Sequence, residues 1–202
     1  MTDALETRGN LGGRLQRPGK ALSQMVTSFS QVLIRHGLTM LTVLTVLAIL
    51  LIGLEFGVGQ QAVMPGLSLP LSFYLGAGVL MMVFAAGFWR IRGTPFEYRQ
   101  WMWLAYLFAI SVVEEMAFRV FAPILFDHAV EPRISVLLSN AVFAGLHYLT
   151  LRWRFSNCVW VFLGGLGLAR LFHETEDLAL IIGVHWFATF LNTPTPPSGH
   201  RA

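Results

Sequence analysis

Residues 106–126 read YLFAISVVEEMAFRVFAPILF, an apolar stretch that contains two adjacent glutamates and one arginine. Its length matches the roughly 20 residues that an α-helix needs to cross a bilayer. An ionised carboxylate inside such a segment costs several kcal/mol unless it is paired or protonated. The stretch therefore predicts a transmembrane helix in which Glu114, Glu115 and Arg119 have a special role.

The whole chain has the composition of an integral membrane protein. Of its 202 residues, 55% are hydrophobic and 12% are charged, whereas soluble domains have about 25% charged residues. The net charge is +3, but the basic residues lie in short runs beside apolar stretches, which favours membrane topology over nucleic-acid binding. Cys158 is the single cysteine, so a disulfide framework and a cysteine-rich metal site are excluded.

Apolar segments predict an all-α, polytopic bundle of about six transmembrane spans. They cover residues 37–54, 67–89, 100–126, 134–151, 155–171 and 178–193. Basic residues dominate the segment before the first span and the second and fourth connections, while acidic residues dominate the other connections. Since Lys and Arg stay preferentially in the cytoplasm, this alternation predicts that both termini are cytoplasmic.

The chain divides into four parts by pattern. Apolar residues recur at helical spacing between Leu22 and Leu33, which predicts an amphipathic helix on the membrane surface. A proline-rich tail predicts disorder. The four parts are the cytoplasmic segment 1–36, the two-span region 37–99, the helical core 100–192 and the disordered tail 193–202.

The fifth predicted span contains Gly164, Gly165 and Gly167. Small residues of this kind allow a neighbouring helix to approach closely. We therefore expect a close helix contact at this point of the bundle.

Glu115 and Arg119 are four residues apart, one helical turn along the same face, so they can form an ion pair. Glu114 points about 100° away and lacks that partner on its own helix. This leaves Glu114 as a candidate general base. A purely structural Glu–Arg pair that holds helices together is the alternative interpretation.

Two histidines lie on polar stripes inside predicted spans. Because residues three or four apart share a helix face, each stripe brings several polar groups together. The stripes are Asn140, Phe143 and His147 on one helix and His185, Thr189 and Asn192 on another. Either stripe alone is more typical of an interhelical hydrogen bond, but with Glu114 and Glu115 they indicate a water-containing cavity. The other histidines lie at span ends or in loops and receive no predicted role: His36, His128, His173 and His200.

These residues give the chain a resemblance to the CAAX protease and bacteriocin-processing family, the type II CAAX prenyl endopeptidases and their bacterial relatives. That family carries E-E-x-x-x-R, F-x-x-x-H and H-x-x-x-N on successive core helices. The matching segments here are Glu114-Glu115-Met-Ala-Phe-Arg119, Phe143-Ala-Gly-Leu-His147 and His185-Trp-Phe-Ala-Thr189, and the resemblance covers about residues 100–192. Position 189 departs from the pattern, because it is Thr where the family usually has Asn, and the nearest Asn is Asn192.

The resemblance implies peptide-bond hydrolysis inside a membrane, which we expect to be the bacterial cytoplasmic membrane. Glu114 would activate a water held by His147, while Glu115 and Arg119 would brace the site. His185, with Thr189 or Asn192, would donate hydrogen bonds to the oxyanion. The expected partners are the lipid bilayer and a membrane-associated protein or peptide. Cleavage is expected near a terminus of that substrate, because a helical segment hides its carbonyls in its own hydrogen bonds.

The sequence favours a mechanism without a cofactor, since it contains no H-E-x-x-H motif. Two histidines and a glutamate nevertheless make a catalytic zinc set, and in that case Glu114, His147 and His185 would be the ligands.

Two rival functions remain open from the sequence. Family members are also described as non-catalytic membrane scaffolds or bacteriocin immunity proteins. A small proton-coupled carrier would use buried Glu and His equally well, although the chain shows no internal repeat.

Overall fold

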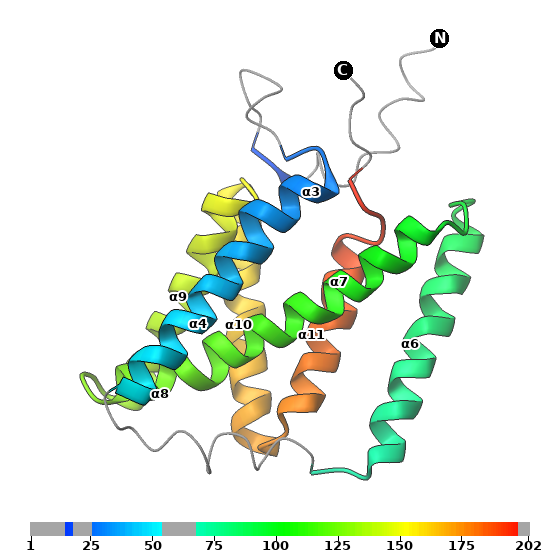
Figure 1. Cartoon of the computed structure of the whole chain (residues 1–202). Helices are drawn as coiled ribbons and strands as arrows, with labels where there is room; N and C mark the ends of the chain where they lie inside the picture. Colours follow the sequence, from blue (N-terminus) through cyan, green and yellow to red (C-terminus); the bar gives the residue numbers. More distant parts are fainter. Residues whose placement is uncertain (1–14, 18–25, 54–67, 198–202) are drawn as a thin grey trace.

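The computed structural model describes residues 15–17, 26–53 and 68–197. Within these ranges the chain forms an all-helical bundle of six helices (Figure 1). The first helix is built from α3 (Phe29–Val32), a π-helical turn η2 (Leu33–Gly37) and α4 (Leu38–Gly53), and the third from α7 (Tyr98–Glu115), a π-helical turn η4 (Met116–Phe121) and α8 (Ala122–Asp127). The others are α6 (Leu71–Ile91), α9 (Pro132–Thr150), α10 (Phe155–Thr175) and α11 (Leu178–Asn192).

The helices coincide closely with the apolar segments of the sequence. Three of them, Phe29–Gly53, Leu71–Ile91 and Phe155–Thr175, are long and apolar enough to cross a membrane, and Leu178–Asn192 is a shorter apolar helix. The α7 and α9 helices are less apolar because they carry buried polar side chains. This membrane character agrees with the sequence composition.

The sequence predicts a surface helix that ends before a separate span beginning at residue 37. The structure instead has one helix that runs without a break from Phe29 to Gly53. The helix begins at Phe29, because Ser28 and Gln31 form a capping box in which each side chain accepts a hydrogen bond from the other residue's backbone N–H. Val26 and Val32 are buried against the rest of the bundle. Residues 1–14 and 18–25 lie outside the described residues.

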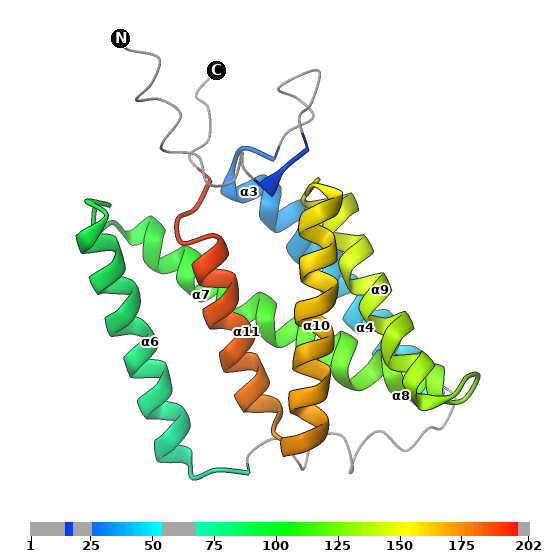
Figure 2. The same cartoon turned by 180° about the vertical axis from the view of Figure 1, so that it is seen from behind.

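The α7 helix crosses the bundle obliquely, whereas α6, α10 and α11 run more nearly parallel to one another (Figures 1 and 2). Glu114 is 16 residues after Tyr98, which is about 24 Å along the helix. His147 lies only three residues before the end of α9, at the same end of the bundle as the start of α7. The inclination of α7 brings these two residues to one depth.

The tail 193–202 was predicted to be disordered, but its first five residues, 193–197, have a defined position after α11. Trp103 Nε1 donates a hydrogen bond to the Thr193 carbonyl at 2.7 Å, and Trp89 Nε1 donates one to the Pro194 carbonyl at 2.8 Å. Indole groups of α6 and α7 thus fix residues 193 and 194 at the end of α11, and Arg99 donates a hydrogen bond to the Pro197 carbonyl. Residues 198–202 lie outside the described residues.

Asp177 fixes the opposite end of α11. Its carboxylate accepts hydrogen bonds from Ser68 Oγ at 2.6 Å, from Tyr74 OH at 2.5 Å and from the Leu180 backbone N–H at 2.9 Å. Burial by itself would raise the pKa of Asp177, but these hydrogen bonds outweigh it and lower the pKa below its usual value. Asp177 therefore caps α11 and joins it to the start of α6.

Candidate active site

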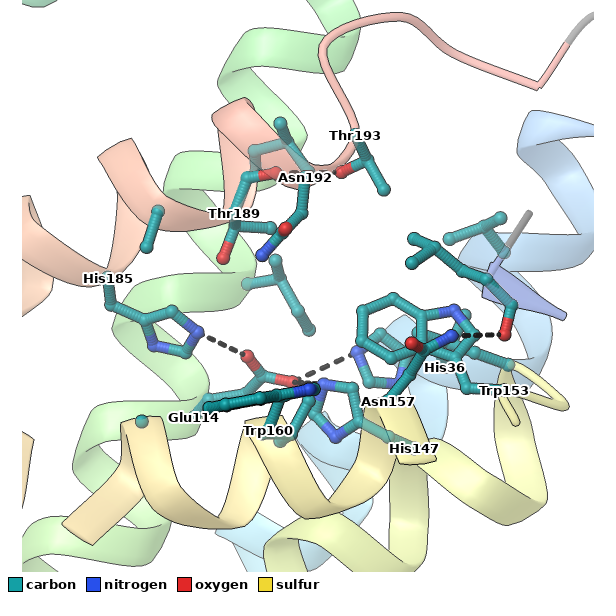
Figure 3. A pocket seen from close by; sticks show the side chains of 18 of the residues that line it. His36, Glu114, His147, Trp153, Asn157, Trp160, His185, Thr189, Asn192 and Thr193 are labelled. Carbon is teal, nitrogen blue, oxygen red and sulfur yellow. Dashed lines mark hydrogen bonds and ion pairs between the residues drawn. The ribbon is translucent and has the colours of Figure 1, made fainter. Parts of the chain in front are cut away.

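Glu114 lies at the centre of the bundle, near the end of α7, where its side chain is 2% exposed. Its Oε1 atom is 2.9 Å from His36 Nε2 and 3.8 Å from His147 Nε2, and its Oε2 atom is 3.5 Å from His185 Nε2. Figure 3 shows the carboxylate between His185 on one side and His36 and His147 on the other. On its own helix Glu114 has no partner, as the sequence predicts. Histidines from three other helices, however, lie close to its carboxylate.

Glu115 is fully buried and has two partners. Arg119 Nε lies 3.2 Å from its Oε2 atom, as the spacing of four residues predicts. His185 Nδ1 lies 2.6 Å from its Oε1 atom. Since a carboxylate only accepts hydrogen bonds, His185 donates here through Nδ1, and this bond fixes the orientation of its ring. Glu115 thus connects Arg119 to a histidine that also faces Glu114.

The close helix contact expected at the glycines involves Gly165 alone. A Cβ atom on Gly165 would collide with the amide oxygen of Asn140 and touch Arg119. All three glycines line the cavity, and Gly164 and Gly167 have open space around them. The absence of a side chain on Gly165 therefore allows α10 to pack closely against Asn140 and Arg119.

His147 is held in one orientation by its own helix. Its Nδ1 atom lies 3.0 Å from the Phe143 carbonyl, which can only accept, so Nδ1 carries a proton. In the neutral ring the Nε2 lone pair then faces Glu114. His147 is thus prepared to accept a hydrogen bond or to bind a cation.

A cavity of about 580 Å³ lies next to the Glu114 carboxylate. This volume is within the usual range for ligand pockets. Its wall is mostly apolar and includes Trp103, Tyr106, Trp160 and Leu168. At the end of the bundle where α11 ends, Gln16, which forms a single β-bridge with Trp153, and residues 195–197 also line it.

Thr189 and Asn192 line the same cavity on α11, and their side chains lie on the far side of it from His147 in Figure 3. The Thr189 hydroxyl has no hydrogen-bond partner among the described residues, although several other threonines of the chain bond back to their own helix. Both residues are therefore available to a molecule in the cavity. Five of the seven candidate residues thus line this cavity, namely Glu114, His147, His185, Thr189 and Asn192, while Glu115 and Arg119 lie behind His185.

His36 is the site residue that the sequence did not indicate. It is 4% exposed and belongs to the π-helical turn η2, far from the other motifs in the sequence. Its position beside Arg35 at the start of an apolar run is typical of a membrane interface, and nothing in the local pattern predicts its contact with Glu114. The sequence shows only a histidine directly before the predicted span 37–54.

These features define a helical membrane protein with a carboxylate–histidine centre beside a buried cavity. Residues 96–191 match the family model described as type II CAAX prenyl endopeptidase Rce1-like. Over this region the chain is similar to the Rce1-like family, a family of membrane-embedded proteases, and the resemblance drawn from the motifs is confirmed. No curated protein and no solved structure matches the chain. His36 lies outside the matched region, and Asn192 follows directly after it.

Proposed function

We propose that the protein is an intramembrane endopeptidase that hydrolyses a peptide bond of a membrane-associated protein or peptide. The observation that carries the proposal is the position of Glu114, a buried carboxylate that borders a cavity and faces three imidazoles. The match of residues 96–191 to a protease family supports a peptidase reaction at this centre.

The proposed nucleophile is a water held between Glu114 and His147. The 3.8 Å between Glu114 Oε1 and His147 Nε2 is too long for a direct hydrogen bond and suits a bridging water. Glu114 takes a proton from this water as the oxygen attacks the substrate carbonyl carbon, and the proton then passes to the leaving amine. None of these steps requires a cofactor.

The oxyanion needs hydrogen-bond donors on the opposite side of the substrate. His185 borders the cavity beside Glu114 Oε2, and Thr189 and Asn192 follow it along α11. We propose that one of the last two residues replaces the asparagine that the family usually has at position 189. Glu115 and Arg119 hold His185 in place from behind.

The shape of the cavity favours an extended, apolar substrate segment. A helical segment would present no free carbonyl, so a terminal tail or an unwound turn is the proposed substrate form. The wall of Trp and Leu side chains suits large apolar residues next to the cleaved bond.

The proposed topology has six spans with the mouth of the cavity on the cytoplasmic side. The basic connections, which contain Arg90, Arg92, Arg99, Arg152 and Arg154, lie at the same end of the bundle as the start of the first helix and the end of the last (Figure 1). Because basic residues stay in the cytoplasm, we propose that this end faces the cytoplasm. We propose the bacterial cytoplasmic membrane as the location.

The decisive experiment compares membrane proteomes of cells that carry wild type, Glu114→Gln or Glu174→Gln. Glutamine has the shape of glutamate but cannot take a proton from water, so the precursor should accumulate with Glu114→Gln while the amount of folded protein stays unchanged. Glu174 is half-exposed in a surface pair with Arg170, and its substitution is the matched control.

With a purified substrate, Glu114→Gln should reduce turnover by at least about 10² to 10⁴. Accumulation with Glu114→Gln alone supports the protease. Equal proteomes for all three strains, or substantial cleavage by Glu114→Gln, would instead favour a non-catalytic scaffold, an immunity-type protein or a carrier.

A further inference from the structure

A short N-terminal segment, residues 15–17, is bound to residues 152–154 in the connection between α9 and α10. Gln16 and Trp153 form an antiparallel β-bridge. Two main-chain hydrogen bonds of 2.8 Å flank the bridge, from the Arg17 N–H to the Arg152 carbonyl and from the Arg154 N–H to the Leu15 carbonyl. This is one unit of an antiparallel strand ladder. Residues 15–17 are called the strap below, and residues 152–154 the docking edge.

Side chains beside the docking edge also bind the main chain of the strap. Asn157 Nδ2 donates a hydrogen bond to the Leu15 carbonyl at 2.9 Å, and Arg154 Nε donates one to the Gln16 carbonyl at 3.1 Å. Main-chain groups are the same in every peptide, so these bonds do not depend on which side chains the bound segment carries. The docking edge therefore has the means to bind the backbone of another extended segment.

The strap's own side chains hold it on this edge. The Arg17 guanidinium lies 3.8 Å from the centre of the Tyr148 ring and donates a hydrogen bond to the Tyr148 carbonyl at 3.0 Å. The Gln16 amide exchanges two hydrogen bonds with the main chain of Val26, at 2.7 and 3.0 Å. These contacts are particular to the sequence of the strap, so the chain fills its own docking edge.

Arg152 gives the docking edge its shape. Its φ angle is 55°, in the left-handed region that residues other than glycine seldom adopt. The residue follows directly after Leu151, the C-cap of α9, and redirects the chain so that its carbonyl faces the Arg17 N–H. A strained backbone of this kind persists only where the surrounding structure holds it, and such positions cluster at ligand-binding sites.

The docking edge lies at the mouth of the cavity that contains Glu114. Leu15, Gln16, Trp153 and Asn157 all line this cavity. The Trp153 ring is 5.2 Å from the His147 ring, centre to centre, and Figure 3 shows Trp153 and Asn157 close to His147. A peptide paired with the docking edge would thus lie one side chain away from the histidine that faces Glu114.

We propose that residues 152–154, together with Asn157, bind the backbone of an extended peptide by strand addition, and that the strap occupies this subsite until a peptide displaces it. Strand addition suits the proposed reaction, because an extended segment presents the carbonyl that a helix would hide. The view that this peptide is the substrate rests on the proposed function, whereas the binding itself does not.

The strap and a peptide use the same N–H and carbonyl groups of the docking edge, so they exclude one another. A segment tethered by a short linker competes at an effective concentration of the order of millimolar. A free peptide with a Kd of about 0.1 mM for the empty edge would therefore bind roughly tenfold more weakly while the strap is in place.

The experiment measures binding of a fluorescein-labelled peptide with the sequence of residues 13–19 to the full chain in detergent, by fluorescence anisotropy. Arg17→Pro removes the N–H and the guanidinium that hold the strap, and leaves the docking edge intact. We expect this variant to bind the peptide about tenfold more tightly than wild type. Arg170→Ala, which removes an exposed arginine of α10, is the control and should bind like wild type.

The docking edge is tested in the variant with the released strap. Arg154 is the N-cap of α10 with a φ angle of −62°, so proline fits there and removes an N–H that the helix does not use. Arg17→Pro/Arg154→Pro should bind the peptide at least roughly tenfold more weakly than Arg17→Pro/Arg154→Ala, which keeps this N–H. A peptide that is N-methylated at the position of Arg17 lacks the donor to the Arg152 carbonyl and should lose binding to Arg17→Pro by a similar factor.

Folding of each variant is checked by its elution profile, and Arg17→Ala, with an expected gain of about fivefold, replaces Arg17→Pro if the latter does not fold. The proposal is overturned if release of the strap leaves peptide affinity at the wild-type value, as a purely structural fastening would. Equal binding of the two Arg154 variants, or of the methylated and unmethylated peptides, overturns it as well. Since cleavage is not measured, a negative result here leaves the proposed protease reaction standing, and a protein without protease activity can still bind the peptide.

Discussion

Replacing Arg119 with alanine should destabilise the protein strongly, because it leaves a buried carboxylate without its cation. The Arg119 and Glu115 side chains are 1% and 0% exposed and approach to 3.2 Å. Removing one partner of such a pair costs about 3–5 kcal/mol. His185 still donates to Glu115 at 2.6 Å, so we expect a value in the lower half of this range.

This loss is large enough to measure in detergent. One kcal/mol lowers the unfolding temperature by about 2–4 °C in a protein of this size, so Arg119→Ala should unfold roughly 6 to 16 °C below wild type. Thermal unfolding followed by tryptophan fluorescence measures this shift. The matched control is Arg170→Ala, which breaks an exposed pair with Glu174 at the same spacing of four residues and should leave the unfolding temperature unchanged. An Arg119→Ala protein that unfolds within 2 °C of wild type would refute the reasoning.

The oxyanion donors, the topology and the cap at the start of α11 can each be tested. Asn192→Ala should slow cleavage more than Thr189→Ala, by about a hundredfold, and Thr189→Asn should retain or raise activity; wild-type rates in both alanine variants would contradict the oxyanion assignment. A reporter fused after Arg99 should be cytoplasmic and one at Glu174 external, and either reversal would break the six-span topology. Because the pKa of Asp177 is lowered in the folded state, its stabilisation is present above the unfolded pKa of about 3.9 and is lost as the pH falls through the folded pKa. Unfolding temperatures from pH 6 to pH 3 should therefore drop further for wild type than for Asp177→Asn, and parallel curves would exclude this role.

The helices were predictable because each apolar run ends at charged or turn-forming residues. The fifth predicted span, 155–171, and the sixth, 178–193, begin where α10 and α11 begin. The first helix was predicted too short, since Arg35 and His36 resemble an interface in the sequence. His36 is buried instead, because the helix places it against Glu114 and Thr150, and such tertiary burial has no local signal.

The contacts of the site were predictable only within single helices. The pairing of Glu115 with Arg119 follows from helical spacing alone. The bond between His185 and Glu115 and the approach of His36 to Glu114 join residues of different helices. Their formation depends on the oblique course of α7, which no periodicity in one segment can specify.

In the proposed six-span topology, the shortness of α11 has a consequence for the surrounding lipid. Its 15 residues span about 22 Å, whereas the hydrocarbon core of a bilayer is about 30 Å thick. A helix that is too short draws the two lipid interfaces together at a cost of fractions of a kcal/mol per Å. We expect the bilayer to thin beside α11, next to His185 and Thr189, so that water and the peptide backbone of an incoming tail cross fewer Å of hydrocarbon before they reach the centre.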